Sequence, residues 1–111
     1  MSLRSLGEVQ SVAISGSTAT LVEPVAGKRV RVLGYVAVAG AEGATFLFET
    51  DDGTTATPPD LTGAIVLAAG GVVVAPVDGN GWFETADGEG LGLVVSAGAV
   101  NGHLTYQIVT A

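Results

Sequence analysis

The sequence predicts an all-β fold, a single β-sandwich that is jelly-roll-like and has about eight strands. The first observation is the spacing of glycine and proline: the longest stretches free of both, 44–52 and 103–111, are nine residues long. An α-helix of ordinary length, about 11 or 12 residues, hardly fits between such breaks. The second observation is that 48% of the residues are hydrophobic but only 5% are aromatic. The core must therefore be built from Val, Ala, Leu and Ile, and the β-branched residues among these favour sheets.

The strand candidates are the short runs rich in Val, Ile, Leu and Thr that lie between these breaks. They are Glu8–Ile14, Thr18–Val22, Lys28–Ala39, Ala44–Thr50, Ala64–Leu67, Val72–Val77, Leu91–Ser96 and His103–Val109. We expect the second half of the third run to be buried on both sides, as in a central strand. We expect the last run to have one buried face, with Leu104, Tyr106 and Ile108 on it. Residues 1–7 then form an N-terminal arm, and residues 8–111 form the sandwich domain.

The connections contain residues that tolerate turn conformations. The predicted turns are Gly16-Ser17, Gly40-Ala41-Glu42-Gly43, Asp51-Asp52-Gly53, Asp78-Gly79-Asn80-Gly81 and Asn101-Gly102. Asp52-Gly53 and Asn101-Gly102 are dipeptides typical of tight hairpin turns. Two longer links, 55–62 and 78–90, are the candidates for the crossings between sheets that a jelly roll requires.

The charge distribution argues against two classes of partner. All four basic residues lie within the first 31 positions, and the formal net charge of the chain is −7. Such a surface repels a polyanion, so we expect no nucleic acid partner. No apolar run approaches the roughly 18 to 20 residues that cross a bilayer, so we expect no membrane partner. The chain has no cysteine, which rules out disulfides and thiolate metal sites.

The residue types that carry catalysis are scarce. The single histidine, His103, has no marked serine partner, because Val12-Ala13-Ile14-Ser15-Gly16 lacks the leading glycine of a nucleophile elbow. One histidine without cysteine makes a hydrolytic zinc site improbable. Asp51-Asp52-Gly53 and Asp87-Gly88-Glu89 contain oxygen ligands for calcium but lack the spacing of a dedicated loop, and Asp before Gly suits a turn. We therefore predict no enzyme activity, no cofactor and no metal.

Trp82 and Phe83 stand out because they place the only Trp beside one of three Phe, in a connection otherwise made of small and polar residues. In one interpretation the two rings cap the open end of the sandwich. In the other they anchor a subunit contact, where aromatic side chains concentrate binding energy. A stacking surface for a sugar ring is a third use.

Four segments carry a family resemblance. They are Ala26–Leu33, Leu61–Ile65, Gly81–Leu91 and Val100–Tyr106. In order and spacing they resemble small β-sandwich proteins encoded among tailed-phage virion genes, which are similar to capsid decoration (cement) proteins. The resemblance implies a homotrimer on the outer surface of the virion capsid, bound to the major capsid protein. It transfers no catalytic residues.

This interpretation identifies candidate interface residues. An N-terminal arm can add a strand to the sheet edge of a neighbouring subunit, and the two arginines near residue 30 can pair with acidic loops of an adjacent copy. The predicted interface residues are Leu3, Arg4, Leu6, Arg29, Arg31, Trp82 and Phe83.

The alternative is a phage tail or head-fibre module that binds a host glycan or receptor, because jelly-roll sandwiches also serve in lectins. Such a module needs a groove lined by aromatic and amide side chains. Trp82, Tyr35 and Tyr106 are few for that purpose.

Overall fold

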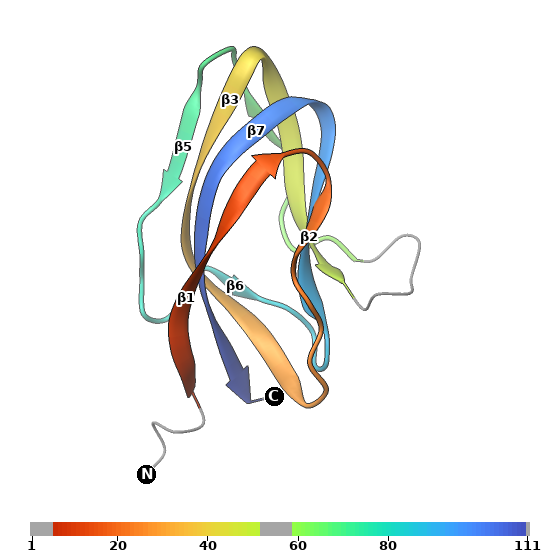
Figure 1. Cartoon of the computed structure of the whole chain (residues 1–111), viewed down its shortest axis with the longest axis vertical. Coiled ribbons are helices and arrows are strands. Elements are labelled where there is room, and N and C mark those ends of the chain that lie inside the picture. The colour runs from red at the N-terminus through yellow and green to blue at the C-terminus, as the bar shows by residue number, and fades with distance from the viewer. Residues whose placement is uncertain (1–5, 52–58, 111) are drawn as a thin grey trace.

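The structure is a computed structural model that describes residues 6–51 and 59–110, which form seven antiparallel strands and no helix (Figure 1). Three strands are longer than ten residues, and the other four have two to four residues. The strands are β1 (Leu6–Gly16), β2 (Ala19–Val22), β3 (Lys28–Asp51), β4 (Ile65–Leu67), β5 (Val72–Ala75), β6 (Phe83–Glu84) and β7 (Gly90–Thr110). The predicted all-β fold class is confirmed.

The two longest strands, β3 and β7, belong to both layers of the sandwich. They pair with each other along almost their whole length, and Figure 1 shows both arching over one end of the molecule. Half A of the sheet has the order β1, β7 (100–110), β3 (28–39), β5, and half B has the order β2, β7 (90–98), β3 (44–51), β4. If β3 and β7 are each divided at the bend and the two-residue strand β6 is left out, the chain has eight segments. Numbered in chain order, they are arranged 1-8-3-6 in half A and 2-7-4-5 in half B. This is the jelly-roll arrangement, formed here by one continuous sheet folded onto itself.

The predicted hairpin turns at 40–43 and at Asn101-Gly102 are wrong, because both segments lie within strands. Between Ala39 and Ala44 the strand β3 advances five residues, while its partner β7 advances two, from Val100 to Gly98. The extra residues form a bulge that bends the strand. Glycine is needed in β7 for close approach rather than for a turn: a Cβ on Gly102 would lie 1.9 Å from the carbonyl oxygen of Val36.

A second bulge changes which side chains of β3 face the core. Val32 lies opposite Tyr106 while Gly34 lies opposite Thr105, so Leu33 is an extra residue in the strand. The alternation therefore inverts after Leu33. The expectation that both faces of the second half are buried is wrong, because Val38 is 37% exposed on the outer face.

The core lies between the inner faces of the two halves. Its centre is Phe48 of half B, which is fully buried and whose ring lies 5.0 Å from that of Tyr35 in half A. The prediction for the last strand is confirmed: Leu104 is fully buried, and Tyr106 and Ile108 pack against the core. The buried cluster consists of Ile14, Val22, Val30, Val32, Ala37, Ala39, Ala44, Phe46, Phe48, Leu91, Leu93, Val100 and Leu104.

The connections differ in how far they match the expected turns and crossings. The turn at 78–81 is present, with the Gly81 N–H donating to the Asp78 carbonyl oxygen at 2.9 Å. The 78–90 link does cross between the halves, since β6 pairs with Arg31 and Val32 in half A before β7 begins in half B. The described part of the 55–62 link stays in half B, where Leu61 N–H donates to the Phe48 carbonyl oxygen. The predicted turn at Asp52-Gly53 lies outside the described residues.

Candidate interaction surface

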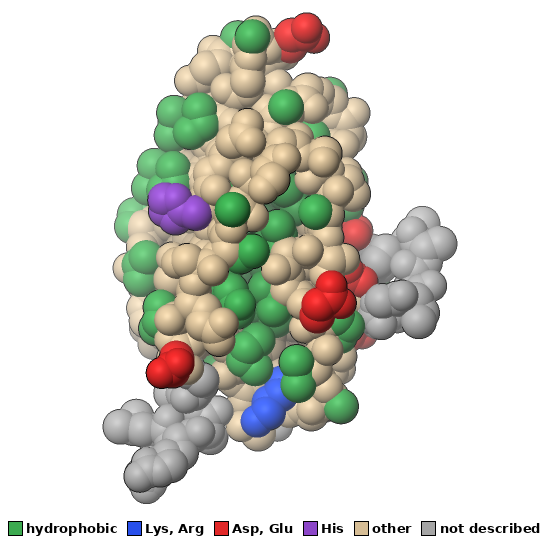
Figure 2. All heavy atoms as spheres, viewed as in Figure 1, with side chains coloured by type: hydrophobic (Ala, Val, Ile, Leu, Met, Phe, Trp, Pro, Cys, Tyr) green, Lys and Arg blue, Asp and Glu red, His purple; other side chains and the backbone are tan. Residues whose placement is uncertain are grey.

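The outer face of half A presents a cluster of partly exposed valines, which we call the valine face. It consists of Val36 and Val38 of β3 and of Val74 and Val72 of β5, which lie directly opposite them. Directly paired residues of an antiparallel sheet have side chains on the same face. Figure 2 shows apolar side chains gathered along the side of the molecule where β5 lies, next to the histidine. A contiguous exposed apolar surface of this kind marks an interaction site.

The valine face continues across half A without a charged side chain. Val36 is aligned with His103 of β7, and His103 is aligned with Ala13 of β1. The next row consists of Val38, Asn101 and Ser15. His103, which was considered for catalysis, thus lies exposed on this face.

The outer face of half B is different, because it carries carboxylates. Glu49 and Asp51 project there from β3, and Asp60 forms a bridge with Glu49. Burial raises the pKa of the Glu49 carboxyl above its usual 4.5, and the negative charges of Asp51 and Asp60 raise it further. The carboxylate of Asp51 also accepts a hydrogen bond from the Thr20 hydroxyl at 2.6 Å. The two outer faces therefore differ in polarity, and only that of half A suits an apolar partner.

Trp82 and Phe83 take separate roles. Phe83 caps the core, with its ring 5.6 Å from that of Phe48. Trp82 is 53% exposed, and its indole N–H donates to the carbonyl oxygen of Pro76, directly after β5, at 2.8 Å. The indole is thus fixed beside the C-terminal end of β5, with about half of the residue's surface open to solvent.

An open groove of about 430 Å³ lies beside β5. Tyr35, Trp82 and Phe83 contribute aromatic rings to its lining, and Leu61 and Thr62 contribute its other side. Partial burial raises the pKa of the Tyr35 hydroxyl above its ordinary value of 10.0, so the phenol stays neutral in water at pH 7. Of the three aromatic residues considered for a receptor-binding groove, Tyr35 and Trp82 line it and Tyr106 does not, and the described lining contains no amide side chain.

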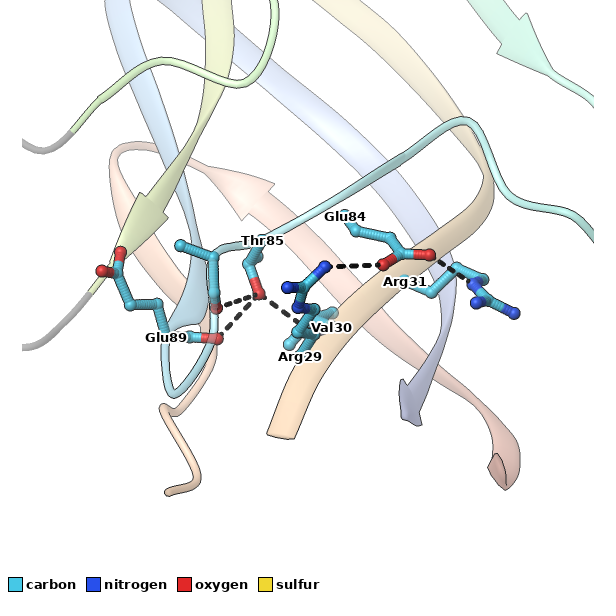
Figure 3. A network of polar contacts seen from close by, with 7 residues as sticks. Arg29, Val30, Arg31, Glu84, Thr85 and Glu89 are labelled. Atoms are coloured by element: carbon cyan, nitrogen blue, oxygen red, sulfur yellow. Dashed lines mark hydrogen bonds and ion pairs between the residues drawn. The ribbon is translucent and has the colours of Figure 1, made fainter. Parts of the chain in front are cut away.

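The two arginines of the predicted interface are paired within their own chain. Arg31 Nε donates to Glu84 Oε2 at 2.7 Å, and Arg29 Nη1 lies 3.7 Å from Glu84 Oε1 (Figure 3). Glu84 is placed there because β6 pairs directly with Arg31. The Nε atom of Arg29 is buried without a hydrogen-bond partner. We therefore do not need acidic loops of another copy to account for these two cations.

A buried threonine next to this ion pair holds the 85–89 loop against β3, and sequence reasoning missed it. Thr85 Oγ1 accepts a hydrogen bond from the Val30 N–H at 2.9 Å and donates to the Glu89 carbonyl oxygen at 2.8 Å (Figure 3). The carboxylate of Glu89 in turn accepts a hydrogen bond from the Thr50 hydroxyl. Thr50 and Thr85 are each only 2% exposed. No short-range pattern signals the contacts of Thr85 with Val30 and of Thr50 with Glu89, because these partners are 55 and 39 residues apart in the sequence.

The remaining predicted residues lie at the N-terminus. Leu3 and Arg4 are outside the described residues, and Leu6 begins β1 opposite Val109. The candidate calcium segment Asp87-Gly88-Glu89 is a turn, with the Glu89 N–H donating to the Ala86 carbonyl oxygen at 3.0 Å. Within 6–51 and 59–110, no three or more His, Cys, Asp or Glu side chains are grouped so as to hold a metal ion. The same residues contain no helix of the length and apolarity needed to span a membrane.

Comparison with known proteins gives only weak structural similarity. No family model matches the chain, and no curated protein matches it. A solved structure described as Bacillus endospore appendages that form a novel family of disulfide-linked pili matches with a TM-score of 0.47 and 16% identity. The match covers 96% of this chain and 88% of that one. A similarity at this level carries no information about function, and this chain has no cysteine.

Proposed function

We propose that this protein is a structural virion protein that binds the outside of a phage head shell as a trimer and stabilises the shell. The observation that carries the proposal is the valine face with the adjacent Trp82. Exposed apolar surface raises the free energy of a monomer in water. This cost is removed when a partner covers the surface. A decoration protein meets hundreds of identical sites on one particle, so mass action favours the bound state.

The proposal assigns the attachment to the shell to the N-terminal arm, residues 1–7. The last two residues of the arm, Leu6 and Gly7, are the first two of β1, whose described backbone pairs only with β7, so one edge of β1 is open to a further strand. An extended terminal segment binds a neighbouring sheet edge through main-chain hydrogen bonds.

Co-sedimentation with undecorated head shells tests this assignment. We expect the full chain to pellet with shells, and we expect a chain lacking Met1 to Leu6 to stay in the supernatant while keeping its β-sheet circular dichroism. Substitution of the exposed Val66→Ser on β4 provides a control that leaves the arm intact. Equal pelleting of the shortened and full chains would show that the arm is not the attachment.

A second candidate function is recognition of a host glycan or receptor by a tail or head-fibre module. It is supported by the groove, where Tyr35, Trp82 and Phe83 offer ring faces to a ligand. The fluorescence of Trp82, the only Trp, would report binding directly. A saturable change in its emission with host surface glycans, abolished by Tyr35→Ala, would favour this function over decoration.

A further inference from the structure

We propose that a second copy of this chain covers the valine face and the adjoining free edge of β5. The inference rests on the proposed function and adds to it the surface through which the copies meet. The occupant follows from the charge, the strand edge and the apolar area of this part of the molecule.

Charge selects this face for contact between copies. Each chain carries a formal net charge of −7, so two copies repel each other over most of their surfaces. The two rows of half A that contain Val36 and Val38 consist of valine, alanine, serine, asparagine and histidine, with no acidic residue. The outer face of half B carries Glu49 and Asp51, and burial, followed by the negative charges of Asp51 and Asp60, raises the pKa of Glu49. Half A is therefore the side where two acidic copies approach at the lowest electrostatic cost.

β5 is a short edge strand of four residues, and Pro76 follows it directly. Its backbone pairs with β3 on one side, and the described residues place no strand on the other side. Natural proteins protect such edges with short strands, charges, proline or bulges. The residues of β5, Val72-Val73-Val74-Ala75, include no charge and no proline. By contrast β1, the opposite edge of half A, carries Glu8. The short length of β5 limits main-chain pairing, while its uncharged side chains leave this edge open to contact with another copy.

The apolar area is large enough for the centre of an interface. Val38, Val72, Val74, Val77 and Trp82 are between 37% and 66% exposed. Together they leave roughly 500 Å² in contact with water, within the range of the largest patches on monomers and more than half of the ~800 Å² that each partner buries in a standard interface. The serine, asparagine and histidine side chains of half A provide the polar rim that surrounds such a centre.

Matched charge substitutions test the contact. Val74 lies on the valine face and is 57% exposed, while Val66 lies on β4 of half B and is 74% exposed. We make Val74→Glu and Val74→Lys, and as controls Val66→Glu and Val66→Lys, in the full chain. Glu at position 74 increases the net negative charge of each copy, whereas Lys reduces it. If both variants weaken association, the cause is the lost apolar contact and not the repulsion between copies. Because both sites are exposed, we expect all four variants to keep the β-sheet circular dichroism, and Val72→Lys replaces any Val74 variant that does not.

Sedimentation equilibrium gives the mass, and Trp82 emission gives a readout from the contact itself. We expect the unaltered chain to have a multiple of its 11.0 kDa mass, with Trp82 emission shifting to longer wavelength on dilution. We expect both Val74 variants to weaken association ~100-fold and to show the long-wavelength emission at all concentrations. The Val66 variants should associate as the unaltered chain does.

The outcomes separate this inference from the proposed function. A monomeric unaltered chain, or equal dissociation of the Val66 and Val74 variants, would overturn the contact whether or not head shells bind the chain. An oligomer that is dissociated only at Val74 but binds no shell would establish the contact and overturn the decoration role.

Discussion

Replacing Thr85 with valine tests whether the buried hydroxyl stabilises the fold. The substitution keeps the shape of the side chain and removes the Oγ1 atom that accepts from the Val30 N–H and donates to the Glu89 carbonyl oxygen. Thr85 is 2% exposed, so water does not readily replace the lost partner. The variant leaves the Val30 N–H and the Glu89 carbonyl oxygen without the hydrogen bonds that they make to this buried hydroxyl.

The structure sets the size of the effect. A buried polar group without a partner costs about 1–3 kcal/mol, and the two groups together should lower the free energy of unfolding by about 2–4 kcal/mol. Thr18 offers a matched control because its Oγ1 accepts from the Val95 N–H at the same distance, 2.9 Å, on an exposed edge. Water can take its place there, so Thr18→Val should change the free energy of unfolding by less than about 0.5 kcal/mol.

Urea unfolding followed by far-ultraviolet circular dichroism measures both variants. All samples are compared at one protein concentration, because association between copies adds to the apparent stability. We expect the Thr85→Val transition to move to lower urea with an unchanged slope, and its Tm to fall by about 10–20 °C at ~5 °C per kcal/mol. A Thr85→Val midpoint that matches that of Thr18→Val would refute the role assigned to this hydroxyl.

Two further predictions concern the bend of β7 and the acidic face. Gly98→Ala should lower the free energy of unfolding by about 3 kcal/mol or more, because its Cβ would lie 2.0 Å from the Gly43 carbonyl oxygen at a φ of +69°. The control Gly63→Ala, where nothing lies within 4 Å, should have little effect on the same urea curve, and similar midpoints for the two would contradict the close approach. Glu49→Gln should stabilise the fold at pH 7, because the raised pKa means that the folded state disfavours the ionised carboxylate. This advantage should fade as the pH falls through the raised pKa and vanish below the unfolded value near 4.5, whereas an advantage that grows in acid would show the opposite sign of shift.

Much of the fold could be predicted because strands and breaks leave local signals. All eight predicted runs fall within or overlap strands of the jelly roll, since glycine spacing and β-branched residues act over short distances. The bends could not be predicted in the same way. Asn101-Gly102 has the composition of a tight turn, but Gly102 is used where β7 approaches Val36 too closely for a side chain. Composition does not distinguish these two uses of glycine.

The interaction surface was less predictable because it depends on contacts distant in sequence. The extra residue Leu33 inverts the alternation of β3, so Val36 and Val38 lie on the outer face, although the second half of their run was expected to be buried on both sides. Arg31 was expected to reach another copy, but Glu84 was not recognised as its partner because the two are 53 positions apart. Trp82 was identified correctly as distinctive from composition alone, and only the structure separates its exposed ring from the capping ring of Phe83.

The central claim is that this jelly-roll domain is an assembly part of a virion, and counting its copies on purified particles tests that claim most directly. Quantitative mass spectrometry of particles, combined with imaging of the bound protein, gives both number and place. We predict hundreds of copies distributed over the outer surface of the head. A handful of copies confined to the tail tip, or none on the particle, would contradict the account.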